Sequence, residues 1–273
     1  MMLNRRSTLA SYLTNLLASG RVSFTRDEAI AELNTTSRGF LAAARRLQDK
    51  NALINPRQGF YVVVPPQYLA RGAPPPQWYI NDLMKHEGSP YYVGLLKAAE
   101  IHGASHQAVM QFQTVTDKRM PKIRAGRSIL TFFYRKDLDA LRAAITDHKT
   151  DTGFFKLSSP ELTGLDLLRY MHVTGTIDSI ATVLSDLGAK MNAAELQKLA
   201  PAFERSVIQR LGYLLDFVKH NQAAEGLHAY LHNEKLLPWV DLDPSKKASK
   251  SRNPAERDTR WNVLVHRRPE LDQ

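Results

Sequence analysis

The chain is 273 residues long and contains no cysteine, which excludes disulfide bonds, thiolate nucleophiles and cysteine-ligated metal centres. Its 43% hydrophobic and 23% charged residues are typical of a globular protein with room for two domains. Residues 1–20 lack the apolar core of a signal peptide, and no apolar run of membrane-spanning length follows. We therefore expect a soluble cytoplasmic protein with no membrane contact.

The positive charge is concentrated near the N-terminus. Residues 1–73 contain ten Lys or Arg against four Asp or Glu, whereas the remaining 200 residues contain 27 against 23. The formal net charge of +10 therefore has its basic pole in the first quarter of the chain. Such a pole is typical of a phosphate-binding module, although basic proteins are common and charge alone does not decide the matter.

The first 60 or so residues follow the element order of a winged helix-turn-helix. A helix is predicted over 5–19, with leucines along one stripe, and a short strand over 22–24. A second helix is predicted over 26–33, where Thr25 and Glu28 have the spacing of a capping box. A turn at 34–37 then leads into a third, basic helix.

The third helix has one face to bury and one to expose. Phe40, Ala44 and Leu47 recur at the spacing of a buried helix face, while Arg38 and Arg45 lie on the opposite side. The exposed side therefore suits an anionic partner. The other interpretation is that its basic side chains merely solvate the helix.

A hairpin follows the third helix. Residues 53–54 and the aromatic and β-branched run 60–64 are predicted strands, joined by a turn at 56–59. In winged domains the third helix enters the major groove by its N-terminal end. We therefore predict a winged helix-turn-helix domain at 1–73 that binds double-stranded DNA. The predicted contacts are Thr36, Ser37, Arg38, Arg45, Arg46, Arg57 and Gln58.

Residues 74–273 are predicted to form a larger, mixed α/β and mostly helical domain behind a proline-rich link, so that the whole chain is of the α+β class. Helices are predicted over 77–86, 91–102, 161–172, 177–187, 193–200, 202–219 and 225–233. Strands are predicted over 108–116, 128–135, 154–157, 239–242 and 261–265. Predicted helix-terminal signals are Ser159 and Asn192 as N-caps, and Gly103 and Gly188 as stops. The polar segment 245–258 is expected to be mobile.

A basic loop joins the strands predicted at 108–116 and 128–135, which are expected to pair with each other. This loop is either the solvated end of a hairpin or a second phosphate contact. The candidate secondary phosphate contacts come from this loop and from the N-terminus, and are Arg5, Arg6, Lys118, Arg119, Lys122 and Arg124.

Residues that carry chemistry form only weak patterns. Asp241 and Asp243 alternate as in two-metal nucleotidyl transfer, but the Gly-Ser pair of such enzymes is not just upstream. His228 and His232 are spaced i, i+4 without the glutamate of a zinc hydrolase. The sequence has no phosphate-binding loop, dinucleotide-binding glycine motif or nucleophile elbow. We therefore predict no catalytic site, no metal and no cofactor.

Four sequence blocks together span most of the chain: RQGFYVVVPPQY at 57–68, YYVGLLKAAEIHGASHQ at 91–107, SSPELTGLDLLRY at 158–170 and RLGYLLDF at 210–217. In these blocks and their order, the sequence resembles the AbiEi-type antitoxins of abortive-infection phage-defence systems, which are type IV toxin–antitoxin systems. The resemblance implies a winged helix that binds inverted repeats in its own promoter and represses it. It also implies a non-enzymatic C-terminal domain that neutralises a nucleotidyltransferase-like toxin.

Two other classes stay open. One is a winged-helix transcriptional regulator whose C-terminal domain senses a ligand or oligomerises. A nucleotidyltransferase-like gene immediately downstream would favour the antitoxin over this class. The other is a nucleic-acid-processing enzyme to which the winged module delivers substrate. Replacing Asp241 and Asp243 by Ala would abolish activity in that enzyme, but would leave an antitoxin protective.

Overall fold

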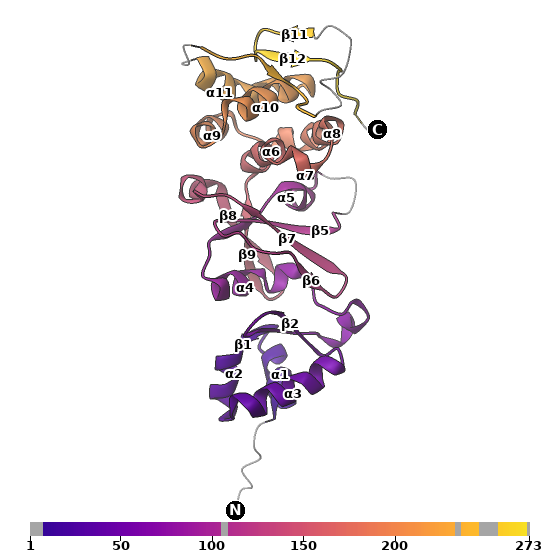
Figure 1. Ribbon diagram of the computed structural model, residues 1–273. Helices are drawn as coiled ribbons and strands as arrows, with labels where there is room; N and C mark the ends of the chain where they lie inside the picture. Colours follow the sequence, from indigo (N-terminus) through magenta and orange to yellow (C-terminus); the bar gives the residue numbers. More distant parts are fainter. Residues whose placement is uncertain (1–7, 105–108, 233–235, 246–255, 272–273) are drawn as a thin grey trace, which may run out of the picture. The chain divides into compact units, whose positions relative to one another are not determined.

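The computed structural model describes residues 8–104, 109–232, 236–245 and 256–271. The fold mixes helices and sheets, which confirms the predicted α+β class (Figure 1). The chain divides into two compact units. Unit 1 comprises 1–92, 110–136 and 147–156, and unit 2 comprises 93–109, 137–146 and 157–273. The boundary predicted at residue 73 lies inside unit 1, and a separate domain at 1–73 stays a prediction. Among the described helices, none combines the length and hydropathy needed to cross a bilayer.

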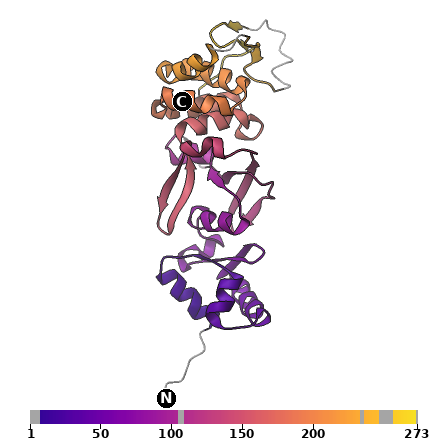
Figure 2. The same ribbon diagram turned by 90° about the vertical axis from the view of Figure 1, so that its left-hand side faces the viewer.

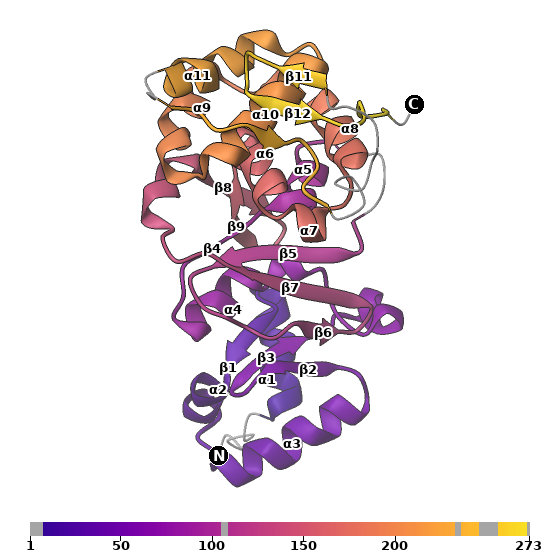
Figure 3. The same ribbon diagram turned by 45° about the horizontal axis from the view of Figure 1, so that its top comes forward.

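The N-terminal part of unit 1 has its elements in the predicted order. They are α1 (Leu9–Ala18), β1 (Ser23–Thr25), α2 (Arg26–Leu33), α3 (Ser37–Asp49), β2 (Leu53–Arg57) and β3 (Phe60–Val63). The strands form an antiparallel sheet in the order β1-β3-β2, which Figure 3 shows beside the helices. The predicted capping box is confirmed, because Thr25 accepts from the Glu28 amide and Glu28 accepts from the Thr25 amide.

An aromatic core holds these helices to the sheet. Phe24 of β1 stacks on Tyr61 of β3, with ring centroids 5.6 Å apart. Tyr12 of α1 and Phe40 of α3 meet Phe24 edge to face. Phe40 and Ala44 are each 1% exposed, so the predicted buried face of α3 is confirmed. Edge-to-face aromatic pairs fix orientation as well as bury area, so this core sets the angle at which α3 lies against the sheet.

A six-stranded sheet, counted over the described residues, runs in the order β6-β7-β5-β4-β9-β8. Its strands are β4 (Tyr91–Val93), β5 (Gln111–Thr116), β6 (Ile123–Ala125), β7 (Ser128–Tyr134), β8 (Ile145–Thr150) and β9 (Gly153–Ser158). The predicted pairing of the strands at 108–116 and 128–135 is confirmed, but their connection as a hairpin is wrong. β5 and β7 pair in parallel, and β6 takes the antiparallel place beside β7 across a tight turn at Gly126 (Figure 3).

Residues 91–93 correct a second expectation. The helix predicted over 91–102 begins only at Leu95, as α5 (Leu95–Ile101), because Tyr91, Tyr92 and Val93 are buried in the sheet as β4. Gly94 separates the strand from the helix, and Leu95, the first residue of the helix, has a left-handed φ of 54°. The predicted stop at Gly103, with φ 73°, is confirmed.

Shorter helical segments connect these elements. The helix predicted over 77–86 is α4 (Ile80–Glu87) in unit 1. The 3-10 turns are η1 (Pro66–Arg71), η2 (Pro76–Trp78), η3 (Asp139–Ala144), η4 (Gly188–Lys190) and η5 (Ala200–Ala202).

Unit 2 is mostly helical. Its remaining elements are α6 (Pro160–Arg169), α7 (Met171–Thr174), α8 (Ile177–Leu187), α9 (Ala193–Leu199), α10 (Arg205–Phe217), α11 (Asn221–His232), β10 (Val240–Asp241), β11 (Glu256–Asp258) and β12 (Val263–Val265). Ser159 and Asn192 cap their helices as predicted. Gly188 does not stop α8 in a left-handed conformation; its φ is −60° and the chain continues into η4. Glycine is required there because a Cβ would overlap the His220 ring.

The end of the chain packs on α10. β10, β12 and β11 form a small sheet, drawn in yellow beside the orange helices in Figure 2. β11 falls within the segment 245–258 that the sequence predicts to be mobile, and is an ordered strand; residues 246–255 of that segment lie outside the described residues. The buried Gln209 of α10 donates to the carbonyls of Pro238 (2.8 Å) and Trp261 (2.9 Å). A buried amide that bonds two loop carbonyls fixes the sheet to the helix.

Candidate nucleic-acid interface

The exposed face of α3 brings most of the predicted contacts together. Thr36, Ser37, Arg38, Arg45 and Arg46 are all exposed, the first two at the start of the helix and the three arginines on its side away from the buried core. The helical period places the arginines opposite Phe40 and Ala44. This face therefore presents several cations to solvent from one rigid element.

Local contacts shape the two ends of this face. Thr36, not Ser37, is the N-cap of α3, and its Oγ1 accepts from the Gly39 amide at 3.1 Å. Near the other end, Arg45 pairs with Asp49 at 3.1 Å, but their side chains are 78% and 59% exposed. An ion pair this exposed contributes about 0.3–0.5 kcal/mol. Arg45 is therefore readily released to a stronger anion such as a phosphate.

The two predicted wing residues have different environments. Gln58 is exposed at the turn between β2 and β3. The Arg57 side chain is only 19% exposed, and its Nε lies 3.1 Å from Glu87 Oε1. Its Nη2 donates to the Pro121 carbonyl at 2.7 Å, and the guanidinium lies over the Phe132 ring. The Arg57 side chain is therefore bound by other residues of unit 1.

Helix α4 holds the wing through three side chains, Asp82, His86 and Glu87, which we call the wing clasp. Asp82 accepts from the Ser23 hydroxyl of β1 at 2.7 Å. The His86 ring donates from Nε2 to the Gln58 carbonyl at 2.9 Å and packs on Phe60. Glu87 binds Arg57. These contacts reach both edges of the small sheet, so α4 fixes the wing's position. Sequence reasoning missed the clasp because nothing local to the wing indicates it.

The secondary phosphate contacts do not form one hairpin loop. Arg5 and Arg6 lie outside the described residues. Lys118 pairs with Glu87 Oε2 at 2.9 Å, and Arg119 lies 4.7 Å from the centre of the Tyr134 ring. Lys122 precedes β6 and Arg124 lies within it, and both are exposed. Because Lys118 shares the carboxylate that engages Arg57, it belongs with the wing clasp.

The residues of the weak catalytic patterns do not come together in one site, and each makes separate local contacts. Asp241 accepts from His266 at 3.1 Å, whereas Asp243 accepts from the Ser245 amide at 2.9 Å. His228 packs edge to face against Trp261 and lies near His232 on α11. Within the described ranges, no group of three or more His, Asp or Glu side chains is placed to hold a metal ion.

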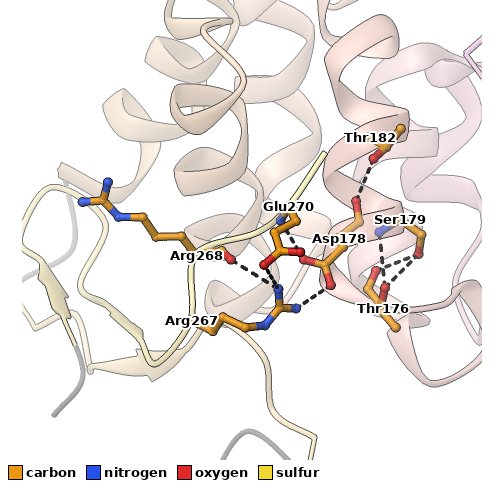
Figure 4. A network of polar contacts seen from close by, with 7 residues as sticks. All are labelled: Thr176, Asp178, Ser179, Thr182, Arg267, Arg268 and Glu270. Carbon is orange, nitrogen blue, oxygen red and sulfur yellow. Dashed lines mark hydrogen bonds and ion pairs between the residues drawn. The ribbon is translucent and has the colours of Figure 1, made fainter. Parts of the chain in front are cut away.

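A charged contact ties the end of the chain to the start of α8 (Figure 4). Asp178 accepts from the Arg267 guanidinium and, at 2.8 Å, from the Glu270 amide. Partial burial raises the pKa of the Asp178 carboxyl, but the hydrogen bonds from Arg267 and Glu270 outweigh it, so that this pKa lies below its ordinary value. The ionised form of Asp178 therefore stabilises the folded state.

The pH dependence of this contact has a definite sign. Since the folded pKa of Asp178 is depressed, its contribution is complete above the unfolded pKa of about 4 and is lost as the pH falls through the folded value. We expect Asp178→Asn to lower the free energy of unfolding by about 1 kcal/mol at pH 7. The gap to wild type should narrow below about pH 4. Urea titrations at several pH values measure it, and an unchanged gap at low pH would contradict the assignment.

Comparisons with known proteins agree with this architecture. The family model of the AbiEi antitoxin C-terminal domain matches residues 92–217. A crystal structure of the RV2827C protein from Mycobacterium tuberculosis is similar in fold, with a TM-score of 0.68 at 17% identity, over 94% of this chain and 90% of that chain. A comparison with curated proteins gave no match. The resemblance seen in the sequence is thus confirmed over residues 92–217, which are similar to the C-terminal domain of the AbiEi antitoxins.

Proposed function

We propose that this protein is the antitoxin and transcriptional autorepressor of a type IV, AbiE-like toxin–antitoxin operon. Its N-terminal elements, from α1 to β3, act as a winged helix-turn-helix that binds inverted repeats in its own promoter. Its C-terminal domain neutralises a nucleotidyltransferase-like toxin in the cytoplasm. It acts without catalysis, as expected of an antitoxin family.

The exposed basic face of α3 is the observation that carries the DNA-binding part. The element order places α3 third among the helices and directly before a β-hairpin, which is the position of a recognition helix. Arg38 lies in its first turn, the part of such a helix that meets base edges. Arg45 and Arg46 lie further along, where backbone phosphates run beside the groove.

Of the two wing residues predicted to contact DNA, only one keeps that role in our proposal. Gln58 at the exposed turn is the side chain free to approach the minor groove or its phosphates. Arg57 instead positions the turn through Glu87 and Pro121. We therefore assign DNA contact at the wing to Gln58 and a positioning role to Arg57.

Promoter binding by the full chain tests this proposal. We expect Arg38→Ala to weaken binding by about 1–3 kcal/mol and to relax preference at one base pair in each half-site. Arg45→Ala and Arg46→Ala should weaken binding to all sequences and each lower the salt slope by about 1. Fluorescence anisotropy with a labelled promoter fragment, at several salt concentrations, measures both effects.

Arg71→Ala is the matched control for lost charge. Arg71 is exposed, but it lies in η1 and its guanidinium rests over the Tyr68 ring. Its replacement should change affinity by less than about 0.5 kcal/mol. If the combined replacement of Arg38, Arg45 and Arg46 left promoter affinity unchanged, α3 would not be the recognition helix.

A further inference from the structure

Leu41 is an exposed aliphatic side chain on the basic face of α3. It is 47% exposed, whereas Phe40 and Ala44 on the same helix are 1% exposed. Sequence reasoning did not single it out, because an isolated leucine between arginines gives no periodic signal. Its exposure matters because Arg38 lies on one side of it along the helix and Arg45 on the other.

Helical geometry places Leu41 with the two arginines. Residues 38, 41 and 45 are spaced i, i+3 and i+7, which puts their side chains along one strip of the helix. Ala42, also exposed, borders this strip. The strip is therefore cationic at both ends and apolar in its middle. Arg38 and Leu41 lie in the N-terminal half of α3, the part nearest the bases in a bound recognition helix.

The chemistry of the major groove matches such a strip. Each A·T pair presents the C5-methyl group of thymine there, next to hydrogen-bond acceptors that suit arginine at neighbouring pairs. Aliphatic contact with this methyl group is an established mode of base discrimination. A protein partner or a second copy of the chain would have to bury Arg38 and Arg45 against its own surface, which is costly without paired acids.

We propose that Leu41 is a specificity-determining residue that contacts the C5-methyl group of a thymine in each operator half-site, between the base contacted by Arg38 and the phosphate contacted by Arg45. The proposal rests on the proposed function and adds to it a base type at a defined place in the site. It predicts that removing one methyl group from the DNA has the same effect as shortening one side chain of the protein.

The test replaces each thymine of the promoter fragment in turn by deoxyuridine, which removes only the methyl group. Binding of the full-length wild type should weaken about fourfold at one symmetry-related thymine per half-site, as expected for one buried methyl group. Leu41→Ala should weaken binding to the thymine fragment by a similar factor and be indifferent to deoxyuridine at that position. Leu69→Ala, an equally exposed leucine (44%) in η1, should behave as wild type.

Each other outcome overturns the proposal in a recognisable way. If wild type binds the promoter but tolerates deoxyuridine everywhere, or Leu41→Ala keeps the wild-type sensitivity, Leu41 does not contact a methyl group. A wild type that does not bind the promoter overturns the proposed function as well. If Leu41→Ala instead turns a dimer into a monomer in sedimentation, the strip binds a second copy of the chain. Unchanged thermal unfolding of Leu41→Ala shows that the variant is folded.

Discussion

Replacing Trp261 by Ala should lower the free energy of unfolding by about 4 kcal/mol, the largest effect that we expect from a single substitution in unit 2. Trp261 is fully buried and lies directly against Gly212 of α10, where any Cβ would overlap its ring. Its indole N–H donates to Asp216 at 2.7 Å. The substitution therefore leaves a cavity and removes one hydrogen-bond donor from a partly buried carboxylate, which keeps its contact with Arg260.

Trp239→Ala is the matched control, because Trp239 precedes β10 and is 42% exposed. We expect it to cost less than about 1 kcal/mol. Urea unfolding followed by far-ultraviolet circular dichroism measures both variants. Equal effects of the two substitutions would mean that the C-terminal sheet does not pack on α10 as described.

Removing the Glu87 carboxylate should lower the free energy of unfolding by about 2 kcal/mol. Glu87→Ala leaves Arg57, whose side chain is 19% exposed, without its counter-charge beside Phe132. It also releases Lys118. We use a value below that of a fully buried pair because both Arg57 and Glu87 keep some solvent contact.

Asp49→Ala removes the partner of another arginine, the exposed Arg45, and should cost less than about 0.5 kcal/mol. A double-mutant cycle separates the Arg57–Glu87 contact from other effects of each substitution. A coupling free energy near zero would show that the Arg57–Glu87 contact contributes nothing, and Arg57 would then return as a candidate DNA contact.

Local signals made the N-terminal elements predictable. The capping box at Thr25 and Glu28, the buried spacing of Phe40 and Ala44, and the β-branched run before Pro65 all act within a few residues. Because local preference and packing agree here, element order and core followed from sequence. The family resemblance was likewise predictable, since its sequence blocks lie partly within the matched residues 92–217.

Long-range pairing was not predictable from local sequence. Residues 91–101 have the composition of one helix, yet residues 91–93 form strand β4 because they are buried in the sheet. The parallel pairing of β5 with β7 depends on β6, a strand of only three residues. β8 was missed because its mostly exposed, polar residues carry no hydrophobic pattern. In each case, tertiary contacts outweigh local propensity.

In the candidate site, too, local features were predictable from sequence and long-range contacts were not. The cationic face of α3 follows from helical periodicity alone. The role of Arg57 does not, because its partner Glu87 lies on another element thirty residues along the chain. Leu41 was missed for a different reason: periodicity identifies apolar residues that are buried, and Leu41 is apolar and exposed.

Growth rescue tests directly whether this protein is an antitoxin. The full chain and its Arg38→Ala, Arg45→Ala, Arg46→Ala triple variant would each be expressed from an unrelated promoter, together with the toxin of the proposed operon. We predict that both restore growth, because the proposed function assigns neutralisation to the C-terminal domain, which would not need the exposed basic face of α3. Failure of the wild-type chain to restore growth, with the protein shown to be expressed and folded, would contradict the account.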